Sequence, residues 1–188
     1  LTIRSANSFP HSSGIASSAS SMSALALCLC SLEAELFGTL EEDEEYDQKA
    51  SFVARLGSGS ACRSIFPGLA VWGESGAVEG SSDLYATSYT NVHEVFKSFH
   101  DDILIVSKGE KSVSSSAGHA LMEGNPYATA RYQQANDRLR LLLENLEDGN
   151  LEGFGQIVES EALTLHAMMM SSQPSYLLMH PNTLTIIQ

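Results

Sequence analysis

The chain has 188 residues and carries 10 lysines and arginines against 23 aspartates and glutamates, a formal net charge of −13. This acidic balance disfavours a nucleic-acid or anionic-membrane surface, because such partners require clustered cations. Hydrophobic residues make up 43% of the chain and charged residues 18%, which is typical of a soluble globular protein with one sizeable domain or two small ones. We therefore expect neither a nucleic-acid nor a membrane partner, although a few local donors suffice to hold a small anion.

The cysteines indicate a reducing compartment. The chain has an odd number of cysteines, and no two of them form a CxxC pair; they are Cys28, Cys30 and Cys62. No basic start leads into a short apolar run, so no signal peptide is expected. Residues 5–32 carry no Asp, Glu, Lys or Arg, but eight serines between Ser12 and Ser31 favour a buried helix over a lipid-facing one.

The N-terminal half predicts short strands and small-residue loops around two helices. A strand is expected over residues 1–6 and a helix over 22–37, ended by Gly38. Apolar residues surround the second half of that helix, which predicts a central place in the core. An acidic helix is expected over 41–56 and a buried strand over 68–73.

The C-terminal half predicts mainly helices. Residues 81–99 read as irregular with a short helix, and 102–107 form the clearest strand. A leucine face predicts a helix over 127–148, ended by Gly149, and a second one follows over 151–171. Pro174 ends it, and Asn182 or Thr183 is expected to cap a last helix. The fold class is therefore α+β, with strands and small-residue loops first and a helical layer afterwards.

Three clusters of serine and glycine, at residues 12–20, 57–64 and 112–118, are the unusual feature of the sequence. Small residues let backbone N–H groups approach an anion, and a following helix adds positive dipole. The first cluster fits this best, because a long helix follows it. A flexible linker or tight helix packing remains the alternative, since no GxxxxGK[ST] pattern is present.

Arg63 lies in the second cluster, just after the run GSGS at residues 57–60, and is one of only ten cations. Arginine can hold a carboxylate or phosphate through two parallel hydrogen bonds. The alternative is an ordinary salt bridge to the acidic segment before it. The six histidines show no HExxH or paired spacing, so no metal site is expected. Residues 168–170, three methionines, read as core packing.

Two segments resemble known motifs. PHSSGIASSAS at residues 10–20 is similar to the ATP phosphate loop of the GHMP kinase superfamily, PxxxGLxSSAS. ARLGSGSACRS at residues 54–64 is much narrower, and it resembles the ARxGSGSACRS segment of the diphosphomevalonate decarboxylase family. GLAVW, DLYA and KSVSS follow in the order of that family, so the resemblance covers nearly the whole chain.

The resemblance implies a GHMP kinase-like fold, with an N-terminal α/β part carrying the phosphate loop and a helix-rich C-terminal part. The corresponding domains would span residues 1–100 and 101–188, each incomplete at one end. It also implies an ATP- and Mg²⁺-dependent reaction, in which 5-diphosphomevalonate is phosphorylated on its tertiary 3-hydroxyl. Loss of phosphate and carbon dioxide then gives isopentenyl diphosphate.

The same resemblance assigns roles to individual residues. Arg63 and Ser18 would be catalytic, and Arg63 would hold the substrate carboxylate. The ATP phosphates would contact Ser13, Gly14, Ser17 and Ser18. The substrate would contact Ser58, Gly59, Ser60, Ala61, Cys62 and Arg63, together with Ser115 and Ser116, where Ser116 replaces the usual threonine.

The departures from the family pattern concern its catalytic groups. Neither the KYWGK segment with its substrate lysine nor the FDAGPN segment with its catalytic aspartate occurs in this sequence. The 188 residues alone are therefore expected to be inactive. A phosphomevalonate decarboxylase, a mevalonate 3-kinase and a non-catalytic small-molecule-binding relative remain alternatives. The family implies a cytoplasmic homodimer.

Overall fold

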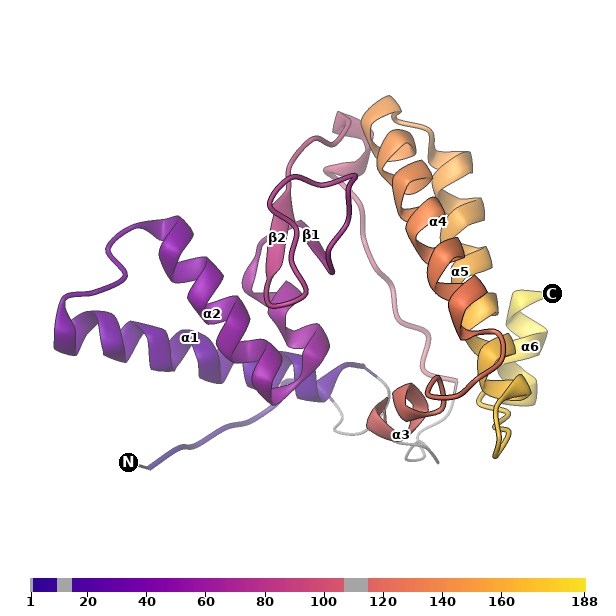
Figure 1. The fold of residues 1–188 in the computed structure, drawn as a ribbon, viewed down its shortest axis with the longest axis horizontal. Coiled ribbons are helices and arrows are strands. Elements are labelled where there is room, and N and C mark those ends of the chain that lie inside the picture. The colour runs from indigo at the N-terminus through magenta and orange to yellow at the C-terminus, as the bar shows by residue number, and fades with distance from the viewer. Residues whose placement is uncertain (1, 10–14, 107–114) are drawn as a thin grey trace. The chain divides into compact units, whose positions relative to one another are not determined.

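Small side chains bring the first two helices together. The computed structural model describes residues 2–9, 15–106 and 115–188, with α1 at Ser17–Phe37 and α2 at Asp43–Gly57 (Figure 1). The buried residues of α1 recur every three or four positions, which places them on one stripe of the helix; they are Ala19, Ser23, Ala26 and Cys30. Ala50 and Ala54 of α2 pack in the same core, where small residues on both helices allow a close approach.

Several large apolar side chains of α1 are exposed. Leu29, Leu32, Leu36 and Phe37 are 39%, 40%, 64% and 74% exposed. The expectation of a helix central in the core was therefore wrong for the described part of the chain, because α1 packs along one side only, where Met22, Leu27 and Ala34 flank the small-residue stripe. By length and composition alone, α1 is the one described helix that could cross a membrane.

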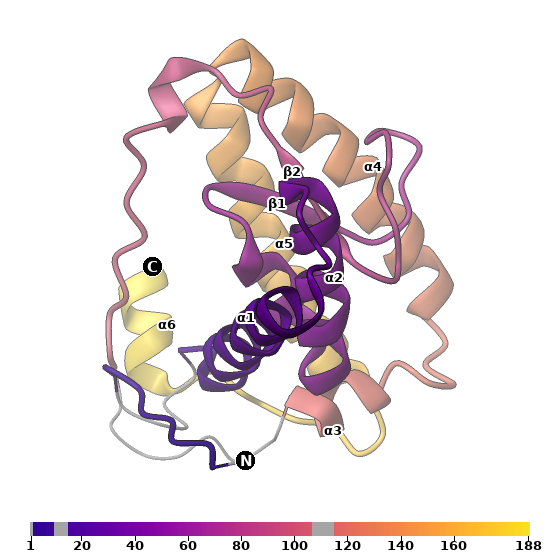
Figure 2. The ribbon, with the colours of Figure 1, turned by 90° about the vertical axis from the view of Figure 1, so that its left-hand side faces the viewer.

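A 3₁₀ helix and a two-stranded sheet follow α2. The 3₁₀ helix η1 spans Gly59–Ile65, where a loop was expected. The predicted strand at 68–73 is confirmed as β1 at Leu69–Trp72, and it pairs antiparallel with β2 at Ala86–Tyr89. The pairing places Trp72 opposite Ala86. Both helices and the sheet contact η1, so this segment lies at the centre of the unit 1–90 (Figure 2).

The second unit, residues 91–188, is built on a helical hairpin. Helix α4 spans Ala128–Asp148 and α5 spans Leu151–Ser171, within one residue of the predicted bounds. Gly149 ends α4 with a left-handed φ of 74°, and the Asn150 side chain caps α5 by accepting the Gly153 N–H. Met168 and Met169 are buried, which confirms their predicted packing role, whereas Met170 is 47% exposed and the same prediction was wrong for it.

Short helices complete this unit. They are η2 at Glu94–Phe96, α3 at Ser115–Ala120 and α6 at Pro181–Ile187. The N–H of His93 donates to Leu146 O at 2.8 Å, and the rings of Phe96, Phe99 and Phe154 meet at centroid distances of 5.1–5.4 Å. These contacts fasten the segment before α3 to the helical hairpin.

Two predicted strands are not strands. Residues 2–6 and 102–106 have no regular structure, and Ile103, Leu104 and Ile105 are all more than half exposed. A strand requires a hydrogen-bonded neighbour, and the described residues form only the β1–β2 sheet. The last helix begins at Pro181, and its N-cap is His180, two or three residues before the predicted capping positions.

One carboxylate joins α4 to α5, and its removal tests the helical hairpin. Glu161 accepts hydrogen bonds from Arg131 and Arg138, and all three side chains are less than a third exposed. We expect Glu161→Gln to lower the free energy of unfolding by about 1–2 kcal/mol, between the values typical of exposed and buried ion pairs. Urea unfolding measures the effect. Glu144→Gln, which breaks the exposed Arg140–Glu144 pair, should cost less than about 0.5 kcal/mol; equal losses would contradict the assignment.

Candidate functional site

The η1 segment is anchored by buried residues and presents its arginine outward. Ala61 and Cys62 are fully buried, whereas Arg63 is exposed. The Cys62 thiol donates to Gly59 O at 3.0 Å, which closes the turn of the segment on itself. Burial raises the pKa of the Cys62 thiol, an effect that the neighbouring Arg63 only partly offsets. The thiol is therefore neutral and packs the segment rather than acting as a nucleophile.

Arg63 has no recorded ion pair in the described part of the chain. The salt bridge to the acidic segment, the alternative raised from the sequence, is not formed there: the ion pair of α2 joins Lys49 to Glu33 of α1. An exposed guanidinium without an internal carboxylate partner keeps its donors available. It can bind an external carboxylate or phosphate through two hydrogen bonds.

The first serine cluster runs into the N-terminus of α1. Ala16 takes a left-handed conformation, with φ of 55° and ψ of 39°, and the helix begins at Ser17 without a side-chain cap. The first turn carries no acidic residue that would repel an anion. The Oγ of Ser17 is buried and has no hydrogen-bond partner among the described residues. A buried hydroxyl without a hydrogen-bond partner costs free energy. The Ser17 hydroxyl is therefore suited to donate a hydrogen bond to an acceptor atom of a bound ligand.

The first and second clusters meet in space. Ser58 Oγ donates to Ser18 Oγ at 3.3 Å, across 40 positions of sequence. The α1 helix also packs against η1, so this hydroxyl contact belongs to a wider interface. Ser17, Ser18 and Ser58 therefore gather hydroxyls beside the N-terminus of a 21-residue helix, an arrangement suited to an anion.

The remaining predicted residues are not brought to this place by the described structure. Ser13 and Gly14 lie outside the described residues. Ser115 and Ser116 begin α3 in the second unit, where only their backbone is described. Ser60 lies in η1 and is half-buried. The roles of these residues stay predictions.

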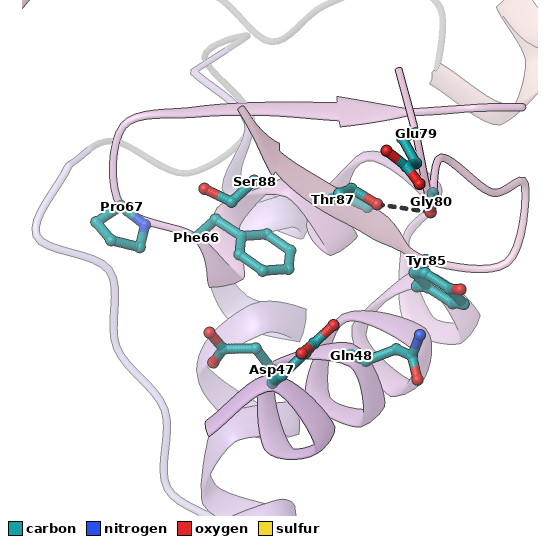
Figure 3. A pocket seen from close by; sticks show the side chains of 11 residues that line it. Asp47, Gln48, Phe66, Pro67, Glu79, Gly80, Tyr85, Thr87 and Ser88 are labelled. Carbon is teal, nitrogen blue, oxygen red and sulfur yellow. Dashed lines mark hydrogen bonds between the residues drawn. The ribbon is translucent and has the colours of Figure 1, made fainter. Parts of the chain in front are cut away.

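A hollow of about 640 Å³ lies elsewhere in the first unit, between α2 and β2. Figure 3 shows Asp47 and Gln48 on α2, with Gln48 below Tyr85, and Phe66, Thr87 and Glu79 on the opposite side of the hollow. Burial, and then the nearby Asp43, raises the pKa of the Asp47 carboxyl. An acidic lining of this kind opposes a diphosphate, so the anion site is assigned to the serine contact and not to this hollow.

Sequence reasoning missed two residues that hold η1. Ser51 of α2 is fully buried and bonds to both η1 and β2. Trp72, the only tryptophan of the chain, lies against Gly59 and donates from Nε1 to Asp83 O at 3.0 Å. The sequence does not predict these contacts, because each joins residues 11 to 35 positions apart and no local pattern links such residues.

The α+β fold, in which serine hydroxyls meet at the start of a long helix, is that of a GHMP kinase-type protein. Residues 1–86 match the model of the diphosphomevalonate decarboxylase-like N-terminal domain. The similarities to diphosphomevalonate decarboxylases extend beyond this match to nearly the whole of this chain.

A diphosphomevalonate decarboxylase from Ganoderma lucidum is 29% identical over 187 residues, covering 98% of this chain and 44% of the relative. The crystal structure of a mevalonate diphosphate decarboxylase from Legionella pneumophila superposes with a TM-score of 0.74 at 31% identity, covering 96% of this chain and 53% of its own. A second structure, a complex with MVAPP, AMPPCP and magnesium, has a TM-score of 0.71 at 25% identity, covering 95% of this chain and 51% of its own. The chain thus spans about half the length of the proteins it matches.

Proposed function

We propose that the chain supplies the phosphate loop, residues 10–20, and the substrate segment, residues 54–64, of an ATP-dependent decarboxylase acting on 5-diphosphomevalonate. The observation that carries this proposal is the 3.3 Å contact between Ser18 and Ser58. It joins the loop that resembles an ATP site to the segment that resembles a substrate site. A phosphoryl donor and its acceptor must lie next to each other for direct transfer, and this contact supports that placement.

The serines at the start of α1 are assigned to the nucleotide. Ser17 offers a buried hydroxyl without a described partner, and Ser18 offers an exposed one. The relative solved with MVAPP, AMPPCP and magnesium binds an ATP analogue, which supports ATP as the donor here. Mg²⁺ is held largely by nucleotide phosphates and waters, and when bound it neutralises charge that develops on the transferred group.

Arg63 and the backbone of η1 are assigned to the substrate. The exposed guanidinium would hold the substrate carboxylate, while Ser58 and Ser60 would offer hydroxyls for further contacts. Fixed donors of this kind stabilise a reacting anion without reorganising during the reaction. Phosphorylation of the tertiary hydroxyl consumes ATP and forms ADP. Departure of that phosphate together with carbon dioxide then leaves isopentenyl diphosphate.

A cytoplasmic location and a homodimeric assembly are part of the proposal. The family resemblance supports both of them. All three cysteines of the chain are free, which supports a reducing compartment.

The experiment measures release of carbon dioxide and phosphate by the full-length protein supplied with ATP and one of three substrates. We expect carbon dioxide only from 5-diphosphomevalonate, with one phosphate released per turnover. Carbon dioxide from 5-phosphomevalonate alone would instead indicate the monophosphate decarboxylase. Phosphorylation of mevalonate without carbon dioxide would indicate the 3-kinase, and no reaction with any substrate would indicate a non-catalytic relative. The 188-residue chain by itself should show no turnover.

A further inference from the structure

Ser51 occupies an unusual place for a polar residue. It lies in the third turn of α2 and is 0% exposed. Its Oγ donates to Cys62 O at 3.0 Å and accepts the N–H of Ala86 at 2.9 Å. One hydroxyl therefore connects α2, η1 and β2, and it satisfies a buried carbonyl and a buried N–H at the same time.

Among the described residues, the other buried serines act only locally. Ser23 donates to Ser20 O, and Ser172 donates to the carbonyls of Met169 and Pro174. Such short-range bonds to the preceding turn are the usual behaviour of a serine in a helix. Ser51 instead reaches 11 and 35 positions along the chain. Its hydroxyl therefore sets the placement of separate elements, which a local bond cannot do.

The bond to Cys62 acts directly on Arg63. The carbonyl of Cys62 and the N–H of Arg63 belong to one planar peptide unit, so fixing the carbonyl fixes the plane from which Arg63 leaves η1. The Cys62 side chain is fully buried on one side of this unit, and Arg63 is exposed on the other. Loss of the Ser51 bond would release the plane while leaving the Arg63 side chain intact.

We propose that Ser51 is a positioning residue, whose hydroxyl holds the Cys62–Arg63 peptide in the orientation that directs Arg63 at the substrate. This inference rests on the proposed function, because it takes Arg63 to be the group that binds diphosphomevalonate. Ser51 touches neither ligand in this scheme and acts only through η1. A displacement of a binding group by about 1 Å can cost up to a hundredfold in rate, so such a residue has a measurable effect.

The test is calorimetric binding of diphosphomevalonate to the full-length protein without ATP. Ser51→Ala should raise the dissociation constant at least fivefold, and Arg63→Ala at least tenfold. In the double variant the constant should equal that of Arg63→Ala within twofold, because Ser51 acts through Arg63. Ser23→Ala, which removes another buried hydroxyl that makes only a local bond, should bind as the parent does.

Unchanged affinity in Ser51→Ala, or full additivity in the double variant, would overturn the inference. Should Ser51→Ala fail to fold, Ser51→Cys keeps the size of the side chain with a weaker donor and acceptor, and it should bind with intermediate affinity; parental affinity in that variant would overturn the inference equally. If the parent binds the substrate and Ser51→Ala weakens binding, but no carbon dioxide is released with ATP, the proposed function fails and the role of Ser51 stands. A parent that does not bind overturns both.

Discussion

Replacing Arg63 by alanine is expected to lower kcat/KM for diphosphomevalonate at least tenfold while leaving the fold intact. The side chain is exposed and has no recorded ion pair among the described residues, so its removal breaks no internal bridge. A hydrogen bond to a charged group contributes about 1.5–3 kcal/mol, which corresponds to roughly 10- to 150-fold in affinity. Steady-state kinetics on the full-length protein measures this loss, and thermal unfolding confirms that the fold is unchanged.

Two further variants separate the charge of Arg63 from its geometry. Arg63→Lys keeps the positive charge but loses the planar pair of donors, so it should fall between the parent and Arg63→Ala. Arg140→Ala removes an exposed arginine whose recorded partner is Glu144 in the same helix, and it should leave kcat/KM unchanged. Normal turnover by Arg63→Ala would remove Arg63 from the site.

The extent to which the sequence predicts this structure depends on whether an element is defined by its own residues. The leucine face and Gly149 predict the bounds of α4 and α5 to within one residue, because helical hydrogen bonds are local. The apolar run at 102–106 reads equally well as a strand, yet it has no described partner to pair with. The strand β2 was missed for the converse reason, since Ala86–Tyr89 is a strand only through its pairing with β1.

The candidate site, too, could be predicted from the sequence only in part. The motif alone predicts that the second cluster and Arg63 bind an anion. The contact between Ser18 and Ser58 could not be predicted, because it depends on how α1 packs against η1. The role of Ser51 is likewise invisible in the sequence, where it is one serine in the middle of an amphipathic helix.

A single added methyl group at Gly59 is expected to disrupt the substrate segment, whereas the same change at Gly57 is not. A Cβ at Gly59 would lie 2.8 Å from Cη2 of Trp72. The indole cannot easily retreat, because its Nε1 is bonded to Asp83 O and Trp72 lies in the β1–β2 pair. Gly59→Ala must therefore displace η1 itself. We expect it to lower the free energy of unfolding of the first unit by about 1–3 kcal/mol, the usual cost of overpacking, and kcat/KM at least tenfold.

Gly57 provides the matched control. A Cβ there would lie 2.5 Å from Sδ of Met22, which is closer than the contact at Gly59. Methionine has three rotatable bonds and can turn its thioether away, and alanine suits the last helical position better than glycine does. Gly57→Ala should therefore change the free energy of unfolding by less than about 1 kcal/mol. The rigidity of the neighbouring group, and not the closeness of the contact, decides the effect.

Both variants are compared in the 188-residue chain by urea unfolding, followed by circular dichroism and by the fluorescence of Trp72, its only tryptophan. Gly59→Ala should shift the native emission of Trp72, and Gly57→Ala should not. Trp72→Phe supplies the decisive background, because a phenyl ring does not extend to the position of Cη2. In the Trp72→Phe background, Gly59→Ala should lower the free energy of unfolding by at least about 1 kcal/mol less than it does in the parent chain. A difference of this size is typical of the coupling between residues in direct contact. Equal costs in the two backgrounds would show that Trp72 does not hold the substrate segment in place.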